Sequence, residues 1–400
     1  MRVAVVGGGL AGLTAALELV DAGNEVTLYE ARPTLGGAVQ TLPEREGDPS
    51  PPPDNGQHIA LGCFTEYLRF LDRIGEGSSY VRLPLELPVL GEDGRAATIT
   101  PSPASLLRYS HLPLRERLGL LRVLLRLRSA EATSQSETFG ERLRRLGATD
   151  LQVDRFWDVF IRPALNLRTD EAGSAPGLFT VRTALLGPRA NSDLILPAKP
   201  LGRMHGEAAA RALEAAGATI ETSTRVDDLE QLDADAVVDA TPPVDVEYSP
   251  IVSVHLLFDR VVLPTPLAAL LDSDAHWVFD RGALTGQRPQ SGQYLTVVSS
   301  GVPELMDVRG RDLVERIAGQ VTQRLGRAEL LWSRVSREPQ ATMALRPGVT
   351  RPAAGVIRPG LARAGAWTET GWPVTMESAV RSGRAAARAL LSDRTTKVAA

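Results

Sequence analysis

Three glycines near the start of the chain have the spacing of a phosphate-binding turn. An apolar run, Val3 to Val6, enters the pattern Gly7-x-Gly9-x-x-Gly12, and a stretch rich in Ala and Leu follows. The first glycine permits a tight strand-to-helix turn, the second lets the backbone approach a pyrophosphate, and the third lets helix and strand pack closely. The helix that begins at Leu10 and Ala11 would offer free N–H groups and its positive dipole end to phosphates. The turn therefore predicts binding of a dinucleotide.

A carboxylate follows this turn at the distance that such sites use. A second apolar strand ends at Glu30, roughly 20 residues after the glycines, where an acid accepts hydrogen bonds from a ribose. Ala31-Arg32 and the pair Gly36-Gly37 come next, and this second glycine pair resembles the extension in FAD enzymes of the amine oxidase and phytoene desaturase type. Those enzymes usually carry Arg after the pair, whereas this chain has Ala38. We therefore expect FAD to contact Gly7, Gly9, Leu10, Ala11, Gly12, Glu30, Ala31, Arg32, Gly36, Gly37 and Ala38.

Composition limits the class of protein. The net charge of −4 comes from interspersed acids and bases, which gives no electrostatic reason to expect a nucleic-acid partner. The single cysteine, Cys63, excludes an internal disulfide and a Cys/His metal cluster, so no metal is expected. No stretch approaches the ~18 to 20 apolar residues of a membrane-spanning helix. We expect the apolar N-terminal run to form a strand and not a signal peptide. We expect a cytoplasmic protein, with peripheral contact on the inner face of the cell membrane left open.

The pattern of elements predicts an α/β fold in which two domains intertwine. A length of 400 residues exceeds one typical core. The buried strand that ends near Ala240 indicates that the chain returns to the first sheet, as doubly wound sheets require. We predict a Rossmann-type FAD-binding domain from residues 1–80, 200–247 and 355–392. A mixed α+β substrate-binding domain with a helical lobe is predicted from 81–199 and 248–354, and a flexible tail from 393–400.

Four segments, in order behind the FAD-type N-terminus, carry a specific resemblance. They are DNGQHIALGCF, WDVFIRPALN, HWVFDRGALTGQ and GAWTETGWPVTMESAVRSG. Together they resemble the squalene-associated FAD-dependent desaturase family from Met1 to about Ala387. The resemblance implies reductive removal of the hydroxyl of hydroxysqualene, a lipophilic C30 isoprenoid, by hydride from reduced FAD, with an electron donor that the sequence does not identify. The alternatives are desaturation of a carotenoid precursor such as phytoene, and a flavin-free lipid or prenyl carrier on the same fold.

The resemblance also implies further cofactor contacts. Gly56 and Gln57 would pass near the isoalloxazine ring, and a helix capped by Thr375 would point at the pyrimidine edge of the flavin. Relatives carry Asp where this chain has Ala366, so with Ala38 two polar contacts are missing. If each loss removes ~1 kcal/mol, FAD binding weakens about tenfold or somewhat more. The expected additional contacts are Gly56, Gln57, Val226, Ala240, Trp367, Pro373, Thr375 and Met376.

Three ionisable residues in these segments are candidates for the acid that protonates the leaving hydroxyl. His58 has the intrinsic pKa best matched to proton donation near neutral pH. Asp54 is a second candidate, with a turn-initiating role as its alternative. Glu377 is the third, and its alternative role is to complement the dipole of the helix that Thr375 begins. Trp157 and Phe160 are expected to pack in the helical lobe rather than to touch substrate.

The segment 114–128 is predicted to be an amphipathic helix. At 100° per residue, Arg115, Arg122 and Arg126 form one narrow stripe and leucines fill a broad opposing arc. One interpretation is a mostly buried helix with a solvated stripe. The other is an interfacial helix through which a water-insoluble substrate enters from the bilayer.

Overall fold

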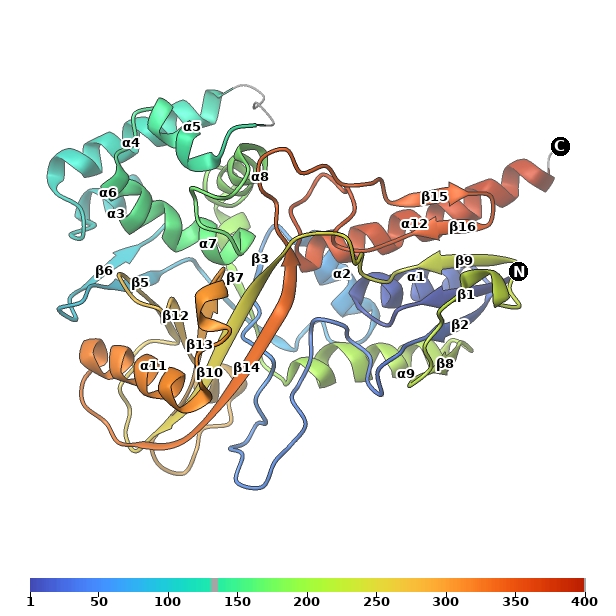
Figure 1. Ribbon diagram of the computed structural model, residues 1–400, viewed down its shortest axis with the longest axis horizontal. Coiled ribbons are helices and arrows are strands. Elements are labelled where there is room, and N and C mark those ends of the chain that lie inside the picture. Colours follow the sequence, from blue (N-terminus) through green and yellow to red (C-terminus); the bar gives the residue numbers. More distant parts are fainter. Residues whose placement is uncertain (131–135, 399–400) are drawn as a thin grey trace.

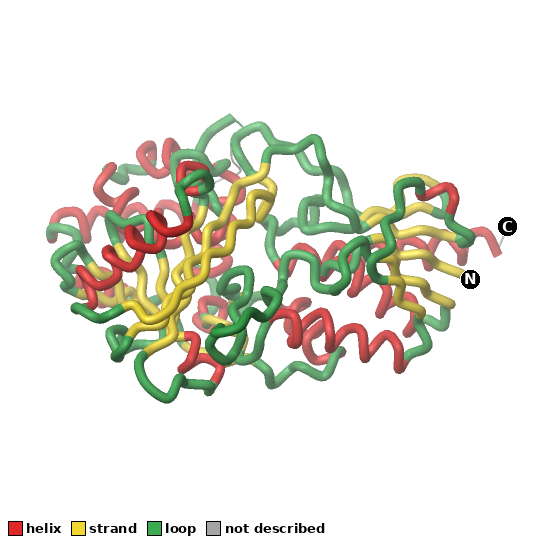
Figure 2. Tube along the Cα trace, turned by 60° about the horizontal axis from the view of Figure 1, so that its bottom comes forward, coloured by secondary structure: helices red, strands yellow, loops and turns green. Residues whose placement is uncertain are grey.

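The computed structural model describes residues 1–130 and 136–398 (Figure 1). A mainly parallel sheet lies in the half of the molecule that holds both termini. A mixed, largely antiparallel sheet and a group of helices make up the other half, and several loops run between the two (Figure 2).

The parallel sheet contains the predicted glycine turn. Its strand order is β15-β16-β9-β1-β2-β8, and all neighbours are parallel except β15 and β16. Val3 and Val5 face the core cluster formed with helices α1, α2, α9 and α12, whereas Ala4 and Val6 face a smaller cluster on the opposite side. The period of two along β1 therefore buries both faces, as a central parallel strand requires. The six strands are β1 (Arg2–Val6), β2 (Glu25–Tyr29), β8 (Thr219–Glu221), β9 (Ala236–Asp239), β15 (Gly355–Arg358) and β16 (Leu361–Arg363).

The second sheet is built around two long strands, β10 and β14, that cross the centre of the molecule in Figure 1. Its order is β14-β10-β13-β12-β11-β5-β6, antiparallel except for the β11–β5 pair. Helix α11 (Gly310–Leu325) packs its apolar residues against β10 and β14. The strands are β5 (Leu87–Leu90), β6 (Ala96–Ile99), β10 (Tyr248–Phe258), β11 (Leu267–Leu270), β12 (Trp277–Asp280), β13 (Gln293–Ser300) and β14 (Leu330–Met343).

A small sheet and a helical lobe complete the fold. Strands β3 (Ala60–Leu61), β7 (Leu194–Pro197) and β4 (Tyr80–Leu83) form a three-stranded sheet in the order β3-β7-β4. Trp157 and Phe156 are buried in the core of the lobe, as expected for Trp157. The lobe consists of α3 (Pro103–Arg108), α4 (Leu114–Ser129), α5 (Phe139–Arg145), α6 (Asp150–Gln152), α7 (Asp158–Leu165), α8 (Ser174–Thr180) and two π-helical turns, η1 (Val153–Trp157) and η2 (Val181–Leu185).

The remaining helices lie mainly on the parallel sheet: α1 (Leu10–Asp21), α2 (Thr65–Arg73), α9 (Ala208–Ala215) and α12 (Met376–Val398), with the short α10 (Arg281–Thr285) following β12. The chain thus has the predicted α/β fold. Strands β3, β4 and β7 join segments that the sequence assigned to different domains, and the domain limits stay predictions. Helix α12 continues to Val398, and the flexible tail from residue 393 stays a prediction; residues 399–400 lie outside the described residues.

Candidate functional site

The glycine turn forms a closely packed cradle between β1 and α1. A Cβ atom at Gly12 would lie 1.8 Å from the Gly7 carbonyl oxygen, so no side chain fits there. A Cβ at Gly9 would meet only the Gly37 Cα, at 3.7 Å. Gly9 is the N-cap of α1 and no side chain caps the helix, which leaves its first-turn amides available to a phosphate. Gly9 therefore marks the open side of the turn, and Gly12 its packed side.

The second glycine pair lies directly against this turn. The Gly36 amide donates to the Gly8 carbonyl at 2.8 Å, and Gly9 and Gly36 form a parallel bridge. A Cβ at Gly37 would lie 2.8 Å from the Gly9 Cα, and the φ of Gly37 is +60°. Both the contact and the backbone conformation require glycine here. Leu10, Gly36 and Ala38 then face a cavity.

Glu30 lies at the end of β2 beside the cradle. Its carboxylate accepts hydrogen bonds from the Gly8 amide at 2.7 Å and from the Arg32 amide at 2.8 Å. Ala31 and Arg32 are exposed at the same edge of the sheet. Ala240 follows β9 next to the turn: its carbonyl oxygen would lie 2.8 Å from a Cβ at Gly7. Val226 packs on the sheet face formed by Ala4, Val6 and Val237. The structure thus gathers these predicted contacts around one end of the sheet.

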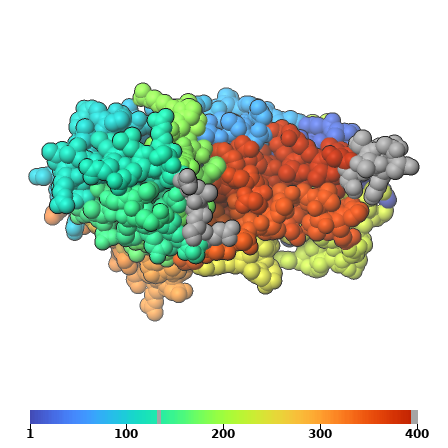
Figure 3. Space-filling model, turned by 90° about the horizontal axis from the view of Figure 1, so that it is seen from above, coloured from blue at the N-terminus to red at the C-terminus, as the bar shows by residue number. Residues whose placement is uncertain are grey.

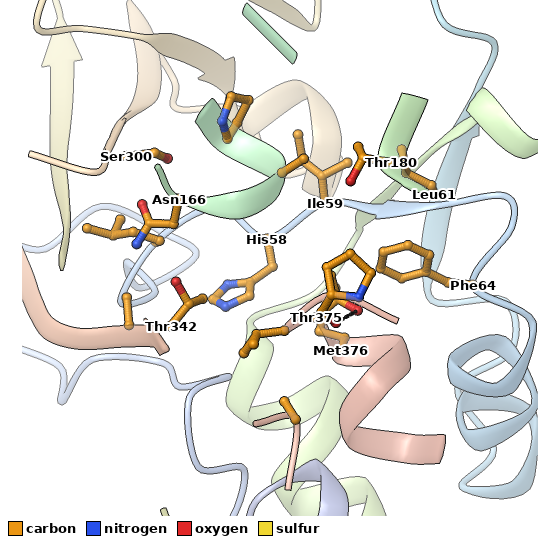
Figure 4. A pocket seen from close by; sticks show the side chains of 18 of the residues that line it. His58, Ile59, Leu61, Phe64, Asn166, Thr180, Ser300, Thr342, Thr375 and Met376 are labelled. Atoms are coloured by element: carbon orange, nitrogen blue, oxygen red, sulfur yellow. Dashed lines mark hydrogen bonds between the residues drawn. The ribbon is translucent and has the colours of Figure 1, made fainter. Parts of the chain in front are cut away.

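A cavity of about 390 Å³ extends from this cradle into the second half of the molecule. Its walls are mainly apolar and come from five parts of the chain: the glycine loops, the loop 55–59, the mixed sheet, the helical lobe and the start of α12. Figure 4 shows His58, Asn166, Thr342 and Met376 among the side chains drawn around it. A cavity that joins a phosphate cradle to an apolar chamber suits a dinucleotide and a lipophilic substrate.

The N-terminus of α12 faces the cavity. Pro373, Thr375 and Met376 line the wall, and the Ser378 amide donates to Thr375 Oγ1 at 3.3 Å, which caps the helix. The remaining first-turn amides and the helix dipole provide positive potential. Such potential stabilises a negative charge on a ring bound beside it.

His58 lines the cavity, as do Gly56 and Gln57. The His58 Nδ1 atom has no hydrogen-bond partner, and neither has Thr342 Oγ1 on the β14 wall. Burial lowers the pKa of His58, and the nearby Asp54 only partly opposes this effect. His58 is therefore neutral near pH 7, which makes it better suited to hold a hydroxyl than to donate a proton from an imidazolium.

Asp54 serves the fold in this structure and is not among the residues lining the cavity. Its Oδ2 pairs with Arg281 Nη1 at 2.7 Å, and both side chains are only 3% exposed. Its Oδ1 accepts from Thr41 Oγ1 at 2.7 Å and from the Leu201 amide at 2.9 Å. The carboxylate thus has partners at both oxygens and does not line the cavity. Asp54 anchors the loop before His58 to the start of helix α10, which follows strand β12 of the mixed sheet.

Glu377 is likewise turned away from the cavity, although its neighbours Thr375 and Met376 face it. Its fully buried carboxylate accepts from the Glu66 amide at 3.2 Å and the Tyr67 amide at 2.9 Å, and it pairs with Arg381 at 2.8 Å. Burial raises the pKa of Glu377, and these partners oppose the rise. The residue caps the N-terminus of α2, a role that differs from the predicted catalytic one.

The sequence prediction did not include Glu338, on strand β14. Among the described residues that line the cavity, it is the only one with a carboxyl group. Burial raises its pKa, although a hydrogen bond from Asn55 and the charge of Arg32 act in the opposite direction. Glu338, Gln340 and Thr342 follow one another at intervals of two residues on strand β14, and all three line the cavity wall. This alternation of polar residues is the sequence signal that could have placed Glu338 on the same strand face as Gln340 and Thr342.

The aromatic residues differ in part from their predicted places. Trp367 is not part of the cavity wall; its ring lies under the guanidinium of Arg363, 5.6 Å away, so it supports the loop before α12. Trp372 lines the cavity instead and makes edge contacts with Phe64 and Phe179. Phe160 packs in the lobe as expected but also reaches the cavity wall.

Comparison with known proteins identifies the class. The model of the flavin containing amine oxidoreductase family matches residues 10–280 and 241–391. The chain therefore belongs to this family, which confirms the predicted FAD cofactor and an oxidoreductase fold. Solved structures agree in fold: cyclohexylamine oxidase from Brevibacterium oxydans aligns with a TM-score of 0.71 at 17% identity over 98% of this chain and 99% of its own. A putrescine oxidase aligns with a TM-score of 0.70 at 15% identity over 100% and 99%.

Relatives with sequence similarity fall into two groups. Hydroxysqualene dehydroxylase of Sinorhizobium fredii is 27% identical over 443 aligned positions, covering 99% of both chains. Zeta-carotene desaturase of Zea mays is 40% identical over 75 residues, but this covers 19% of the present chain and 13% of the relative. 15-cis-phytoene desaturase of an Oncidium hybrid is 23% identical over 98% of this chain and 78% of its own. Thus the zeta-carotene desaturases match over only 12 to 15% of their length.

The residues of the cradle fit FAD. The uncapped start of α1, the space beside Gly9 and the carboxylate of Glu30 supply phosphate and ribose partners, and the cavity continues towards α12. None of the described helices is both long enough and apolar enough to cross a membrane.

Proposed function

We propose that the protein removes the hydroxyl of hydroxysqualene reductively and so forms squalene. The observation that carries the proposal is the largely apolar cavity beside the FAD cradle, with one carboxyl and two unpartnered polar groups in its wall. The end-to-end match to hydroxysqualene dehydroxylase supports the same reaction. Bound FAD in its reduced form supplies the hydride.

The chain's own residues would divide the work of C–O cleavage. Glu338, whose pKa burial raises, would in its protonated form donate the proton to the leaving hydroxyl, which departs as water. The neutral His58 ring and the Thr342 hydroxyl would orient that oxygen, since both residues line the cavity and each has a hydrogen-bonding atom without a partner. The overall change balances as alcohol, proton and hydride giving hydrocarbon and water.

Apolar walls protect the cation that remains when the hydroxyl has left. Ile59, Phe160 and Trp372 are among the side chains that keep bulk water from the substrate chain. Water in the cavity would capture the cation and regenerate the alcohol. The N-terminus of α12 offers positive potential at the cavity wall, which would stabilise the negative charge of a reduced flavin held there.

Oxidative desaturation of a carotenoid precursor is the second candidate. It is favoured by the phytoene desaturase match over 98% of this chain. Membership of the flavin-containing family implies a bound flavin, which argues against a flavin-free lipid or prenyl carrier.

Product analysis distinguishes the two reactions. The FAD-loaded protein is incubated anaerobically with hydroxysqualene and a reductant, and in parallel with phytoene and an electron acceptor. We expect squalene in the first reaction and no product in the second. Conversion of phytoene without formation of squalene would contradict the proposal.

A further inference from the structure

Helix α4 exposes large apolar side chains that have no cover in the described structure. Leu114, Leu118 and Leu125 are 61%, 51% and 70% exposed. The inner side of the same helix is buried in the core of the lobe through Leu120, Val123 and Leu127, which leaves these three leucines outside the protein. In Figure 3 the teal atoms of this part of the chain form the surface at one end of the molecule.

The exposed leucines form a ridge with arginines on both sides. At 100° per residue, Leu114, Leu125 and Leu118 fall within an arc of about 40°, with Arg122, Arg115 and Arg126 at about 80° to 120° and Arg128 on the other flank. All four arginines are exposed. The sequence pattern predicts leucines on the side opposite the arginines, but leucines occupy both the exposed and the buried side of the helix.

Acidic groups do not interrupt this surface on α4. Its one acidic residue, Glu116, is turned towards the lobe, where its carboxylate accepts from Thr149 Oγ1 at 2.7 Å and Gln152 Nε2 at 2.9 Å. The outer side of α4 therefore presents an apolar ridge flanked only by positive charge, which complements a layer of lipid acyl chains beneath anionic headgroups.

The same helix is joined to the cavity wall. Arg182 Nε donates to the Leu127 carbonyl at 3.0 Å and also contacts the Ala130 carbonyl, so π-helical turn η2 is attached to the C-terminal end of α4. Val181, Thr183 and Leu185 of η2 line the cavity. The exposed helix is thus joined, through its C-terminal end, to an element of the cavity wall.

We propose that the outer face of α4 docks the protein on an anionic phospholipid surface, with the leucine ridge inserted and the flanking arginines at the headgroups. A second copy of the chain is a poorer partner, because a symmetric contact would place like arginine stripes opposite each other. The docking surface is argued from α4 alone. Only its use, the uptake of a lipophilic substrate from the membrane, rests on the proposed function.

Flotation with vesicles tests the surface without any substrate. The FAD-loaded protein is mixed with vesicles of phosphatidylcholine alone or with phosphatidylglycerol added. We expect binding to the anionic vesicles that weakens with salt. Leu118→Gln combined with Leu125→Gln should lower binding at least tenfold. Arg115→Gln and Arg122→Gln should each lower binding about fivefold.

Matched controls are Leu331→Gln, at an equally exposed leucine on β14, and Arg288→Gln, at an exposed loop arginine, neither of which should change binding. Circular dichroism and the visible spectrum of bound FAD verify that each variant is folded. Equal vesicle binding by wild type and α4 variants would overturn the proposal. So would a wild-type dimer, seen by light scattering, that the leucine variants dissociate.

The two proposals fail separately. Vesicle binding lost in the α4 variants, with no squalene formed by any protein, would refute the proposed reaction and leave the docking surface intact. Squalene formation in detergent with unchanged vesicle binding would refute only the docking surface.

Discussion

The ion pair between Asp54 and Arg281 offers a sharp test of the roles assigned around the cavity. In Asp54→Asn, the amide oxygen can keep the Oδ1 contacts with Thr41 and Leu201. The Nδ2 group then faces Arg281 Nη1, so two donors meet where an ion pair stood at 2.7 Å. Arg281 retains its charge at 3% exposure without an anionic partner.

Leaving one partner of a buried pair uncompensated costs ~3 to 5 kcal/mol. With an unfolding entropy of about 2.1 cal/mol/K per residue, a chain of this length should lose roughly 4 to 6 °C in Tm. Adding Arg281→Met removes the stranded charge, so the double variant should recover much of that loss.

Differential scanning fluorimetry measures the shift, and turnover is compared per mole of bound FAD below the melting range. Because Asp54 does not line the cavity, we expect turnover per folded molecule to stay within a few-fold of wild type. An unchanged Tm together with a tenfold or greater loss of turnover would refute this reasoning and return Asp54 to the chemistry.

Four further variants address the cofactor and the proton. Gly9→Val should fold but retain no flavin, because the side chain meets open space in the protein and occupies the pyrophosphate position; yellow, folded protein would contradict this. Glu30→Ala should weaken FAD binding by ~1 to 2 kcal/mol, measured by fluorescence titration, whereas an unchanged Kd would show that no ribose contact exists. Glu338→Gln should lower squalene formation at least tenfold, with the exposed Glu92→Gln as control. Since an ionised carboxyl cannot donate a proton, the wild-type rate should fall as pH rises through the raised pKa of Glu338, and this fall should be absent in Glu338→Gln. Ala38 and Glu338 line the same cavity, so the cation added by Ala38→Arg should lower the pKa of Glu338 and move the fall in rate to lower pH; a fall at unchanged pH would show that position 38 is too far from Glu338 to act on it.

The cofactor cradle could be predicted because its determinants are contiguous in sequence. Gly7, Gly9 and Gly12 define the turn through local backbone geometry, and Glu30 follows one strand later. The parallel sheet and the α/β class follow from the same apolar runs. In these parts of the chain, the residues that form the sequence motif are the same residues that contact one another in the structure.

The candidate acids could not be sorted in that way, because their roles depend on distant partners. Asp54 is paired with Arg281 at the start of helix α10, and Glu377 caps α2 through Tyr67, 310 residues away in sequence. Glu338 becomes a candidate acid only because the folded chain places it in the cavity wall. Residue type alone made His58 the leading donor, whereas burial, which only the fold reveals, lowers its pKa.

One single-turnover measurement tests the central claim most directly. The protein is loaded with FAD, reduced anaerobically, freed of excess reductant and mixed with hydroxysqualene while the visible flavin absorption is recorded. We predict that the oxidised flavin spectrum returns and that squalene forms in a one-to-one ratio to it. Flavin that stays reduced, with hydroxysqualene recovered unchanged, would contradict the proposed reaction.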